Sequence, residues 1–340
     1  MKNRLGLAVF LMAVVAVLVL GDRVPSAAQD AAGQAGANGA PPVLNPLKVA
    51  LLRWYKANTV YTMFPVGNEP LGIAFDGSSI WTANWNDNTV TKLRASDGTV
   101  LGTFPSGGAE PYGVTFDGAN IWVSNAASAT VTKLRASDGK NLGTFAVPPS
   151  PGWMTFDGAN IWVPSAPSEG NGSVYKVRAS DGKLVGTFTV GMQPIAAAFD
   201  GENVWVVNGG GNGTGNVTKL RATDGTVLGT FNVGLAPIGI AFDGANIWVA
   251  NDASGSVSKL RASDGTLLGT FNVGSIQPYG LAFDGQSIWV TGGTYIVELR
   301  ATDGKQLGLF HPQSSSSAGV AFDGANIWVT LQKFNSAAKL

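Results

Sequence analysis

The sequence predicts an all-β fold, a seven-bladed β-propeller built from four-stranded blades. A block of Phe-Asp-Gly followed two residues later by Ile-Trp or Val-Trp occurs seven times. Successive tryptophans of this block lie 41, 40, 43, 43, 41 and 39 residues apart, and a fixed period in this range marks a repeat architecture. No useful window has a 3.6-residue apolar period, so no helix is expected within the repeat. The tryptophans are Trp81, Trp122, Trp162, Trp205, Trp248, Trp289 and Trp328.

One repeat, residues 111–146, shows why four strands are expected in each unit. Strand-like segments are predicted over Pro111–Asp117, Ile121–Ser124, Thr130–Ala136 and Leu142–Ala146. Asp-Gly and Asn-rich turn signals separate them, and the third alternates with a period of two. A single four-stranded blade cannot bury both of its faces, whereas radial stacking covers both and leaves short edges.

The ring is expected to close within one blade shared by both ends of the sequence. The length of 340 residues would ordinarily suggest two domains, but the repeat favours a single closed unit over residues 47–340. The last repeat stops at Leu340, where other copies continue into Arg-Ala-Ser-Asp-Gly. We therefore expect Thr59–Val66 to supply the fourth strand of the last blade.

The first residues indicate export. Lys2 and Arg4 precede an apolar core over Leu5–Leu20 and a small-residue site at Ser26–Ala28, which is typical of a signal peptide covering residues 1–28. The alternative is an uncleaved anchor, although this core is short for a membrane-spanning helix. Residues 29–46 are rich in Ala, Gly and Pro and are interpreted as a disordered linker. A secreted or periplasmic location is predicted.

Charge limits the binding partners that are expected for the chain, and cysteine content limits its covalent cross-links. Residues 1–28 contain three basic residues and one acidic residue out of 22 of each, so the mature chain has a net charge of about −2. A near-neutral chain is not expected to bind nucleic acid, and no stable membrane span is expected after cleavage. The chain has no cysteine, so disulfides are excluded. A monomer is predicted.

The strictly repeated residues are interpreted as structural. Aspartates of both turn sets cap their turns while the glycine takes a positive φ, and both sets are expected at one end of the propeller. The tryptophans are expected to pack between blades. The Lys-x-Arg pairs are expected to lay their stems on the next blade and reach turn aspartates. The two sets are Asp76, Asp117, Asp157, Asp200, Asp243, Asp284 and Asp323, and Asp97, Asp138, Asp181, Asp224, Asp264 and Asp303.

Function is expected at the opposite end, where the loops differ from blade to blade. Trp85 stands in a loop where other blades have alanine or a gap. Trp153 occupies an inner-strand position that is Gly or Ala in six blades, so it must project into open space, as a binding anchor or as a plug of the channel. The candidate binding residues are Trp85, Asp87, Glu110, Tyr112, Trp153, Glu169, Asp252 and Tyr279.

No cofactor is predicted, and the metal signals are weak. The loop Asn84–Asn88 offers oxygen ligands for Ca²⁺ but lacks the glycine and the distal glutamate of a calcium loop. The glycine-rich loop at 208–216 lacks the lysine and the following helix of a phosphate-binding loop.

The segments IWVAN (247–251), GSVSKL (255–260) and TFNVG (270–274) resemble YVTN-type and NHL-like bacterial propeller repeats over about residues 49–340. The same superfamily includes the streptogramin B lyases, such as virginiamycin B lyase. The resemblance implies a site of two histidines, a glutamate and Mg²⁺ for those enzymes. This chain has a single histidine, His311, so that site cannot be carried over.

Two functions follow from the sequence. The first is an exported, non-enzymatic propeller that binds a protein, peptide or glycan through its variable loop face. The alternative is a metal-dependent lyase-like or lactonase-like enzyme using Glu110, Glu169, Asp87 or Asp252 with Mg²⁺ or Ca²⁺. The scarcity of histidine favours the first, because a general base needs a well-placed partner and a tuned pKa.

Overall fold

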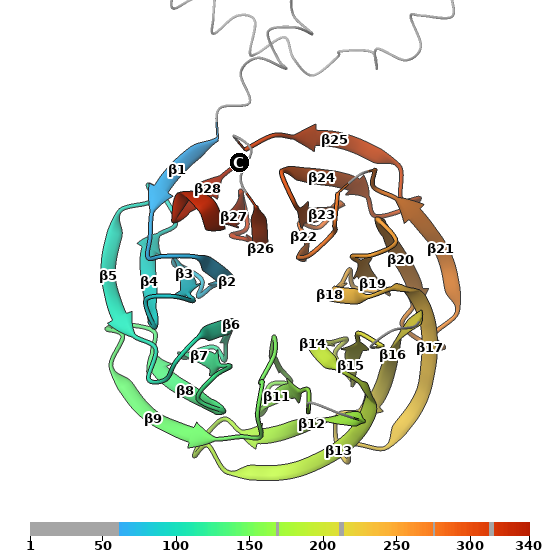
Figure 1. Ribbon diagram of the computed structural model, residues 1–340, viewed down its shortest axis with the longest axis horizontal. Coiled ribbons are helices and arrows are strands. Elements are labelled where there is room, and N and C mark those ends of the chain that lie inside the picture. The colour runs from blue at the N-terminus through green and yellow to red at the C-terminus, as the bar shows by residue number, and fades with distance from the viewer. Residues whose placement is uncertain (1–60, 168–169, 211–213, 275, 313–315) are drawn as a thin grey trace, which may run out of the picture. The chain divides into compact units, whose positions relative to one another are not determined.

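The computed structural model describes residues 61–340 apart from 168–169, 211–213, 275 and 313–315. In this part the chain forms seven antiparallel four-stranded sheets around a central channel, which confirms the predicted propeller (Figure 1). Among these residues, no helix is long and apolar enough to cross a membrane. The predicted signal peptide, the linker and residues 47–60 lie outside the described residues.

Blades 1 to 6 each use four consecutive strands, ordered from the channel outward. Blade 1 contains β2 (Pro70–Phe75), β3 (Ser79–Asn84), β4 (Thr89–Arg94) and β5 (Val100–Pro105), and blade 2 contains β6 (Pro111–Phe116), β7 (Asn120–Asn125), β8 (Thr130–Arg135) and β9 (Asn141–Ala146). Blade 3 contains β10 (Thr155–Phe156), β11 (Asn160–Ser165), β12 (Asn171–Arg178) and β13 (Leu184–Met192), and blade 4 contains β14 (Pro194–Phe199), β15 (Asn203–Asn208), β16 (Thr214–Arg221) and β17 (Val227–Leu235). Blade 5 contains β18 (Pro237–Phe242), β19 (Asn246–Asn251), β20 (Ser256–Arg261) and β21 (Leu267–Asn272), and blade 6 contains β22 (Leu281–Phe283), β23 (Ser287–Gly292), β24 (Tyr295–Arg300) and β25 (Gln306–Phe310).

Blade 7 closes the ring with strands from both ends of the described chain. It contains β26 (Ser317–Phe322), β27 (Ile327–Leu331), β28 (Ser336–Lys339) and, outermost, β1 (Thr62–Pro65). β1 pairs antiparallel with β28, with Met63 opposite Ala338. The predicted closure by an N-terminal strand is therefore confirmed. A 3-10 turn, η2 (Gln332–Phe334), joins β27 to β28.

Each Phe-Asp-Gly turn is tied to the tryptophan that follows it. In blade 1, Asp76 Oδ1 accepts hydrogen bonds from the backbone N–H of Ser78 and Ser79, and Asp76 Oδ2 accepts one from Trp81 Nε1 at 2.8 Å. The same indole bond recurs in the other six blades. The aspartate therefore closes its turn and also fixes the tryptophan that packs against the next blade, alongside Val114 and Ile121 in the case of Trp81.

The lysines and arginines behave differently from each other, which corrects the expectation that both reach turn aspartates. Arg94 does pair with Asp97, at 3.0 Å. Lys92 Nζ instead lies 5.2 Å from the Trp81 ring centroid and donates a hydrogen bond at 2.6 Å to the backbone carbonyl of Ala136 in the next blade. A lysine head buried at the blade interface is satisfied by unpaired carbonyls and an aromatic face, so it needs no carboxylate.

Blade 6 breaks this pattern. Glu298 stands at the lysine position and accepts a hydrogen bond from Ser287 Oγ at 2.8 Å. Among the described residues, Trp289 is the one repeat tryptophan with no lysine over its ring. It is half-buried, whereas the other six tryptophans are fully buried. The interface between blades 6 and 7 therefore lacks the lysine contact, and its tryptophan is less deeply buried than the other six.

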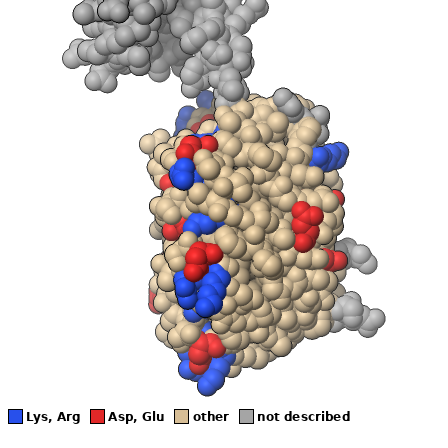
Figure 2. Space-filling model, turned by 90° about the vertical axis from the view of Figure 1, so that its left-hand side faces the viewer, with Lys and Arg blue, Asp and Glu red and all other residues tan. Residues whose placement is uncertain are grey.

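The two ends of the propeller differ in charge. Figure 2 shows Lys and Arg side chains gathered along one edge of the ring, where the two sets of Asp-Gly turns lie. The opposite end, which we call the variable face, is formed by the β3–β4 type of loop and by the connections between blades. Among the described residues its charged side chains are Glu69, Asp87, Glu110, Asp252 and Lys333.

Candidate functional site

The mouth of the channel on the variable face is built from two equivalent positions in each blade. One is the loop residue that follows the second strand, where the backbone N–H of Trp85 donates to the Glu69 carbonyl and that of Asp252 donates to the Ala236 carbonyl. The other is the inner-strand residue after the proline, occupied by Tyr112 in blade 2. The backbone hydrogen bonds repeat from blade to blade, whereas the side chains at these positions differ. The mouth therefore presents different side chains on the same backbone framework.

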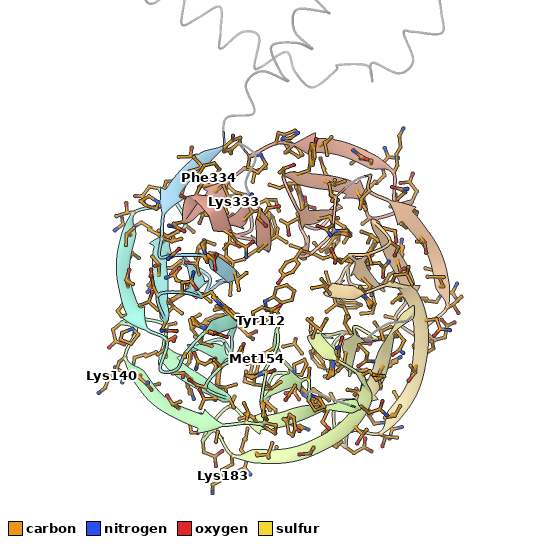
Figure 3. The ribbon with its side chains drawn as sticks, in the orientation of Figure 1. Tyr112, Lys140, Met154, Lys183, Lys333 and Phe334 are labelled. Carbon is orange, nitrogen blue, oxygen red and sulfur yellow. The ribbon has the colours of Figure 1, made fainter. Side chains whose placement is uncertain are left out.

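Three aromatic rings close the channel just below this mouth. Tyr112 and Trp153 stack with ring centroids 5.2 Å apart, and Trp153 meets Tyr279 edge-on at 5.0 Å. The hydroxyls of Tyr112 and Tyr279, from blades on different sides of the channel, lie 2.9 Å apart and share a hydrogen bond. Trp85 extends the cluster with an edge contact to Tyr112 at 5.7 Å. Figure 3 shows Tyr112 at the centre of the ring.

Trp153 reaches the channel because the start of blade 3 is displaced toward blade 4. Its backbone N–H donates to the Ile195 carbonyl at 2.8 Å, and its carbonyl accepts from the Ala197 N–H at 3.0 Å. A Cβ on Gly152 would clash with the Ile195 carbonyl oxygen, just as a Cβ on Gly72 would clash with that of Tyr112. In blade 3 the tight position therefore falls at Gly152 rather than at 153, one residue earlier than the sequence alignment predicts.

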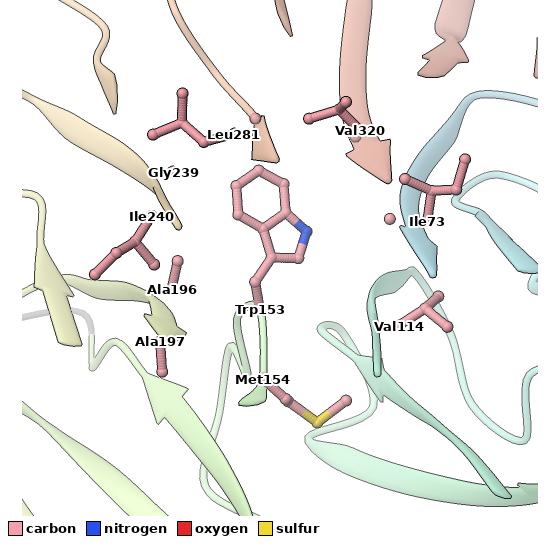
Figure 4. A pocket seen from close by; sticks show the side chains of 13 residues that line it. Ile73, Val114, Trp153, Met154, Ala196, Ala197, Gly239, Ile240, Leu281 and Val320 are labelled. Atoms are coloured by element: carbon pink, nitrogen blue, oxygen red, sulfur yellow. The ribbon is translucent and has the colours of Figure 1, made fainter. Parts of the chain in front are cut away.

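An apolar cavity of about 150 Å³ lies against Trp153 inside the channel (Figure 4). Ile73, Val114, Met154 and Ile240 are among its walls, and no polar side chain lines it. Trp153 lies between the rings of Tyr112 and Tyr279 in the channel, which is the geometry of the second role that its sequence position allows, a plug of the channel.

A second cavity, of about 240 Å³, opens on the variable face across blades 5, 6 and 7. Its lining is mixed: Ile238 and Tyr279 supply apolar surface, and Asp252, Gln277 and Gln332 supply polar groups. Burial raises the pKa of the Asp252 carboxyl above its ordinary value. Burial also raises the pKa of the Tyr279 hydroxyl, with smaller contributions from Tyr112 and from the charge of Asp252.

The structure brings together five of the eight residues predicted from the sequence. Trp85, Tyr112, Trp153 and Tyr279 form one chain of ring contacts, and Asp252 lines the cavity beside Tyr279.

Two others serve the loops themselves. Asp87 Oδ2 accepts a hydrogen bond from the Asn68 N–H at 2.6 Å, which ties the loop at 84–89 to the entry of blade 1. The backbone of Glu110 has φ 57°, and its N–H donates to Asn88 Oδ1. Glu169 lies outside the described residues.

Sequence reasoning missed Gln277, Gln332 and Ile238, although a signal existed for the last two. Aligning the loop residue after the second strand places Gln332 in the same column as Trp85 and Asp252, which are the polar or large members of that column. Ile238 lies in β18 directly after Pro237, at the inner-strand position that Tyr112 occupies in blade 2, so the repeat signals it as well. Gln277 lies in the connection between blades 5 and 6, which the repeat does not align.

Within the described residues, no group of three or more His, Cys, Asp or Glu side chains could hold a metal ion. His311 is exposed on the connection after β25, where its ring centroid lies 3.8 Å from that of Tyr295.

The fold is shared with several solved proteins. No protein-family model matches the chain, and no curated protein matches it in sequence. A structure of Kuenenia stuttgartiensis hydrazine synthase is 16% identical, with a TM-score of 0.69 and coverage of 84% of this chain and 98% of that chain. Virginiamycin B lyase from Staphylococcus aureus is 17% identical, with a TM-score of 0.69 and coverage of 82% and 98%.

A catalytically inactive variant of that lyase with quinupristin is 18% identical, with a TM-score of 0.68 and coverage of 82% of this chain and 98% of that chain. This chain shares the propeller fold of these proteins. At sequence identities this low, the similarity shows a shared fold and says nothing of a shared site, because propellers host unrelated activities.

Proposed function

We propose that this chain is an exported, non-enzymatic binding protein that recognises its ligand on the variable face, at the mouth of the channel. The supporting observation is that the equivalent mouth positions carry Trp85, Tyr112, Tyr279, Asp252 and Gln332 on an otherwise repeated backbone. A rigid ring that holds diverse side chains around a closed floor is suited to recognition. The ligand is a protein, peptide or glycan.

Trp85 is the principal anchor in this proposal. It is half-buried and meets Tyr112 edge-on, so one side of the indole is held while the rest faces the mouth. A tryptophan fixed in this way loses little side-chain entropy on binding and offers a large contact area, as binding hot spots do. Trp153 lies deeper and supports the floor on which the ligand rests.

The alternative, a metal-dependent lyase-like or lactonase-like enzyme, draws on the fold shared with virginiamycin B lyase. We place it second, because Asp87 is engaged in a loop hydrogen bond and Glu110 shapes the blade entry through its backbone. Calorimetric titration with Mg²⁺, Ca²⁺ and Mn²⁺, followed by assays on cyclic esters, separates the two functions. Stoichiometric metal binding together with turnover would replace the binding proposal.

The test of the binding function is capture of the natural partner from the cell envelope by immobilised wild-type and variant chains. Trp85→Ala should weaken capture by about 2 kcal/mol, the usual hot-spot scale, without lowering the melting temperature. Leu101→Ala, an exposed residue on outer strand β5, is the matched control and should leave capture unchanged. Equal capture by the wild type and Trp85→Ala would move the site away from this face.

A further inference from the structure

We propose that the cavity beside Tyr279 binds an organic cation of the ligand, an alkylammonium or guanidinium group, with Asp252 as its counter-ion. This inference rests on the proposed function and names the chemistry recognised at the same face. The cavity of about 240 Å³ has room for such a group and the carbon chain that carries it. The side chains of its lining include one carboxylate, one phenol ring, two amides and two serine hydroxyls.

The carboxylate of Asp252 has no hydrogen-bond or ion-pair partner among the described residues. Every other aspartate in the described part of the chain accepts a hydrogen bond: those of the Asp76 class from turn N–H groups and an indole, those of the Asp97 class from arginine, and Asp87 from the Asn68 N–H. Asp252 is half-buried, and no hydrogen bond or ion pair is found for its carboxylate among the groups that the structure describes. A desolvated carboxylate without a partner costs free energy, and a bound cation would recover it.

The charge of the whole face agrees with a cationic ligand. Among its described residues the variable face carries four acidic side chains, those of Glu69, Asp87, Glu110 and Asp252, against the single base Lys333. The other described lysines and arginines lie toward the end of the ring that carries the Asp-Gly turns, and Figure 2 shows such side chains along that edge on the side that it presents. Such a field concentrates cations at the mouth before any contact is made.

The lining favours an organic cation over a metal ion. Protein Ca²⁺ sites use six to eight oxygen ligands, commonly with more than one carboxylate, and Mg²⁺ is usually held by one or two carboxylates together with substrate phosphates, whereas Asp252 is the one carboxylate among the cavity's lining residues. The ring of Tyr279 and the side chain of Ile238 instead provide surface for the CH groups of an alkylammonium or for the plane of a guanidinium. Gln277 and Gln332 add carbonyl oxygens that accept N–H donors.

The experiment is a titration of the purified exported chain, followed by the amide signals of Tyr279 and Gly293 in two-dimensional NMR. The probes are Nα-acetyl-lysine amide, Nα-acetyl-arginine amide and glucosamine, with the neutral Nα-acetyl-norleucine amide as the isosteric control. At least one cationic probe should give saturable shifts in the millimolar range, and norleucine should give none. Response to the amino-acid probes identifies a basic peptide as the source, and response to glucosamine identifies an amino sugar.

The matched variants are Asp252→Asn and Asp87→Asn, which remove the same charge from the same face. Asp252→Asn should weaken binding of the cationic probe at least tenfold. Asp87→Asn keeps an oxygen for the Asn68 N–H and should change binding less than twofold. Equal affinities for the wild type and Asp252→Asn, or equal shifts with norleucine, would overturn the inference.

The outcome separates the two proposals. If capture of the natural partner depends on Trp85 but not on Asp252, the binding function stands and the cation site is wrong. If it depends on neither, the variable-face function fails as well. Saturable shifts with Ca²⁺ but not with the organic cations would also overturn the inference.

Discussion

At the scale of single residues, the charged carboxylate of Asp252 should lower the stability of the fold, and this effect can be measured without any ligand. Because burial raises the pKa of the Asp252 carboxyl in the folded protein above its ordinary value, the charged carboxylate lowers the stability of the fold at neutral pH, and the folded state is favoured where the group is protonated. Asp252→Asn should therefore raise the melting temperature at pH 7. The gain should shrink as the pH falls through the raised pKa. Thermal melts between pH 3 and pH 8 check this, and a variant that melts lower at pH 7 would contradict it.

Lys92 provides a second test at this scale. Its Nζ donates to the Ala136 carbonyl and faces the Trp81 ring, both at a buried interface. Lys92→Met keeps the carbon stem but removes the donor and leaves that carbonyl unpaired, so the free energy of unfolding should fall by about 1.5–3 kcal/mol. Lys140→Met, at an exposed turn of blade 2, is the control and should change it by less than about 0.5 kcal/mol. Urea denaturation measures both variants. Equal changes in the free energy of unfolding would show that the Lys92 hydrogen bond and ring contact do not stabilise the fold.

At the scale of elements, the N-terminal strand can be removed from its blade. A chain starting at residue 67 lacks β1, so β28 becomes an unpaired edge and the Trp328 ring loses Phe64, which lies 5.3 Å away. This truncation should melt well below a chain starting at residue 61 and should associate through the free edge. Calorimetry and light scattering check the pair. If both chains melt alike as monomers, β1 does not hold the ring closed.

The displaced start of blade 3 gives another element-scale prediction. Trp153→Ala removes the ring between Tyr112 and Tyr279 and joins the mouth to the apolar cavity below. The free energy of unfolding should fall by about 2–4 kcal/mol, less than for a fully buried tryptophan. Trp85→Ala, at the rim of the same cluster, is the comparison and should cost less than about 1 kcal/mol. A Trp153 variant as stable as the wild type would mean that the plug carries no packing energy.

At the scale of the whole molecule, the predicted signal peptide gives a prediction about processing. Loss of residues 1–28 should appear in the intact mass of secreted or periplasmic material, because the apolar core ends in a small-residue cleavage site. A full-length mass in the membrane fraction would instead support an uncleaved anchor.

The sequence predicts the fold far better than it predicts the site, and the reason is physical. Turn glycines, indole-bound aspartates and strand alternation occur in many copies, so each copy confirms the others, and even the closure through β1 follows from the incomplete last repeat. The position of Trp153 depends on a backbone displacement in blade 3. The alignment of the repeats does not show this displacement, because it places Trp153 in the same column as the glycines of the other blades. The cavity at Asp252 needs three neighbouring blades to converge, and their convergence is set by ring geometry rather than by local pattern.

The glutamate at position 298 has a consequence for how the ring moves. A circle of identical joints has no preferred place to open, and its thermal breathing is shared equally. Here the interface between blades 6 and 7 has Glu298 in place of the lysine and leaves Trp289 half-buried, so it differs from the other six interfaces of the ring. The cavity of Asp252, Gly293 and Gln332 spans this sector of the ring. A ligand bound in the cavity would contact blades 5, 6 and 7 at once, and we expect it to slow hydrogen exchange at the interface between blades 6 and 7.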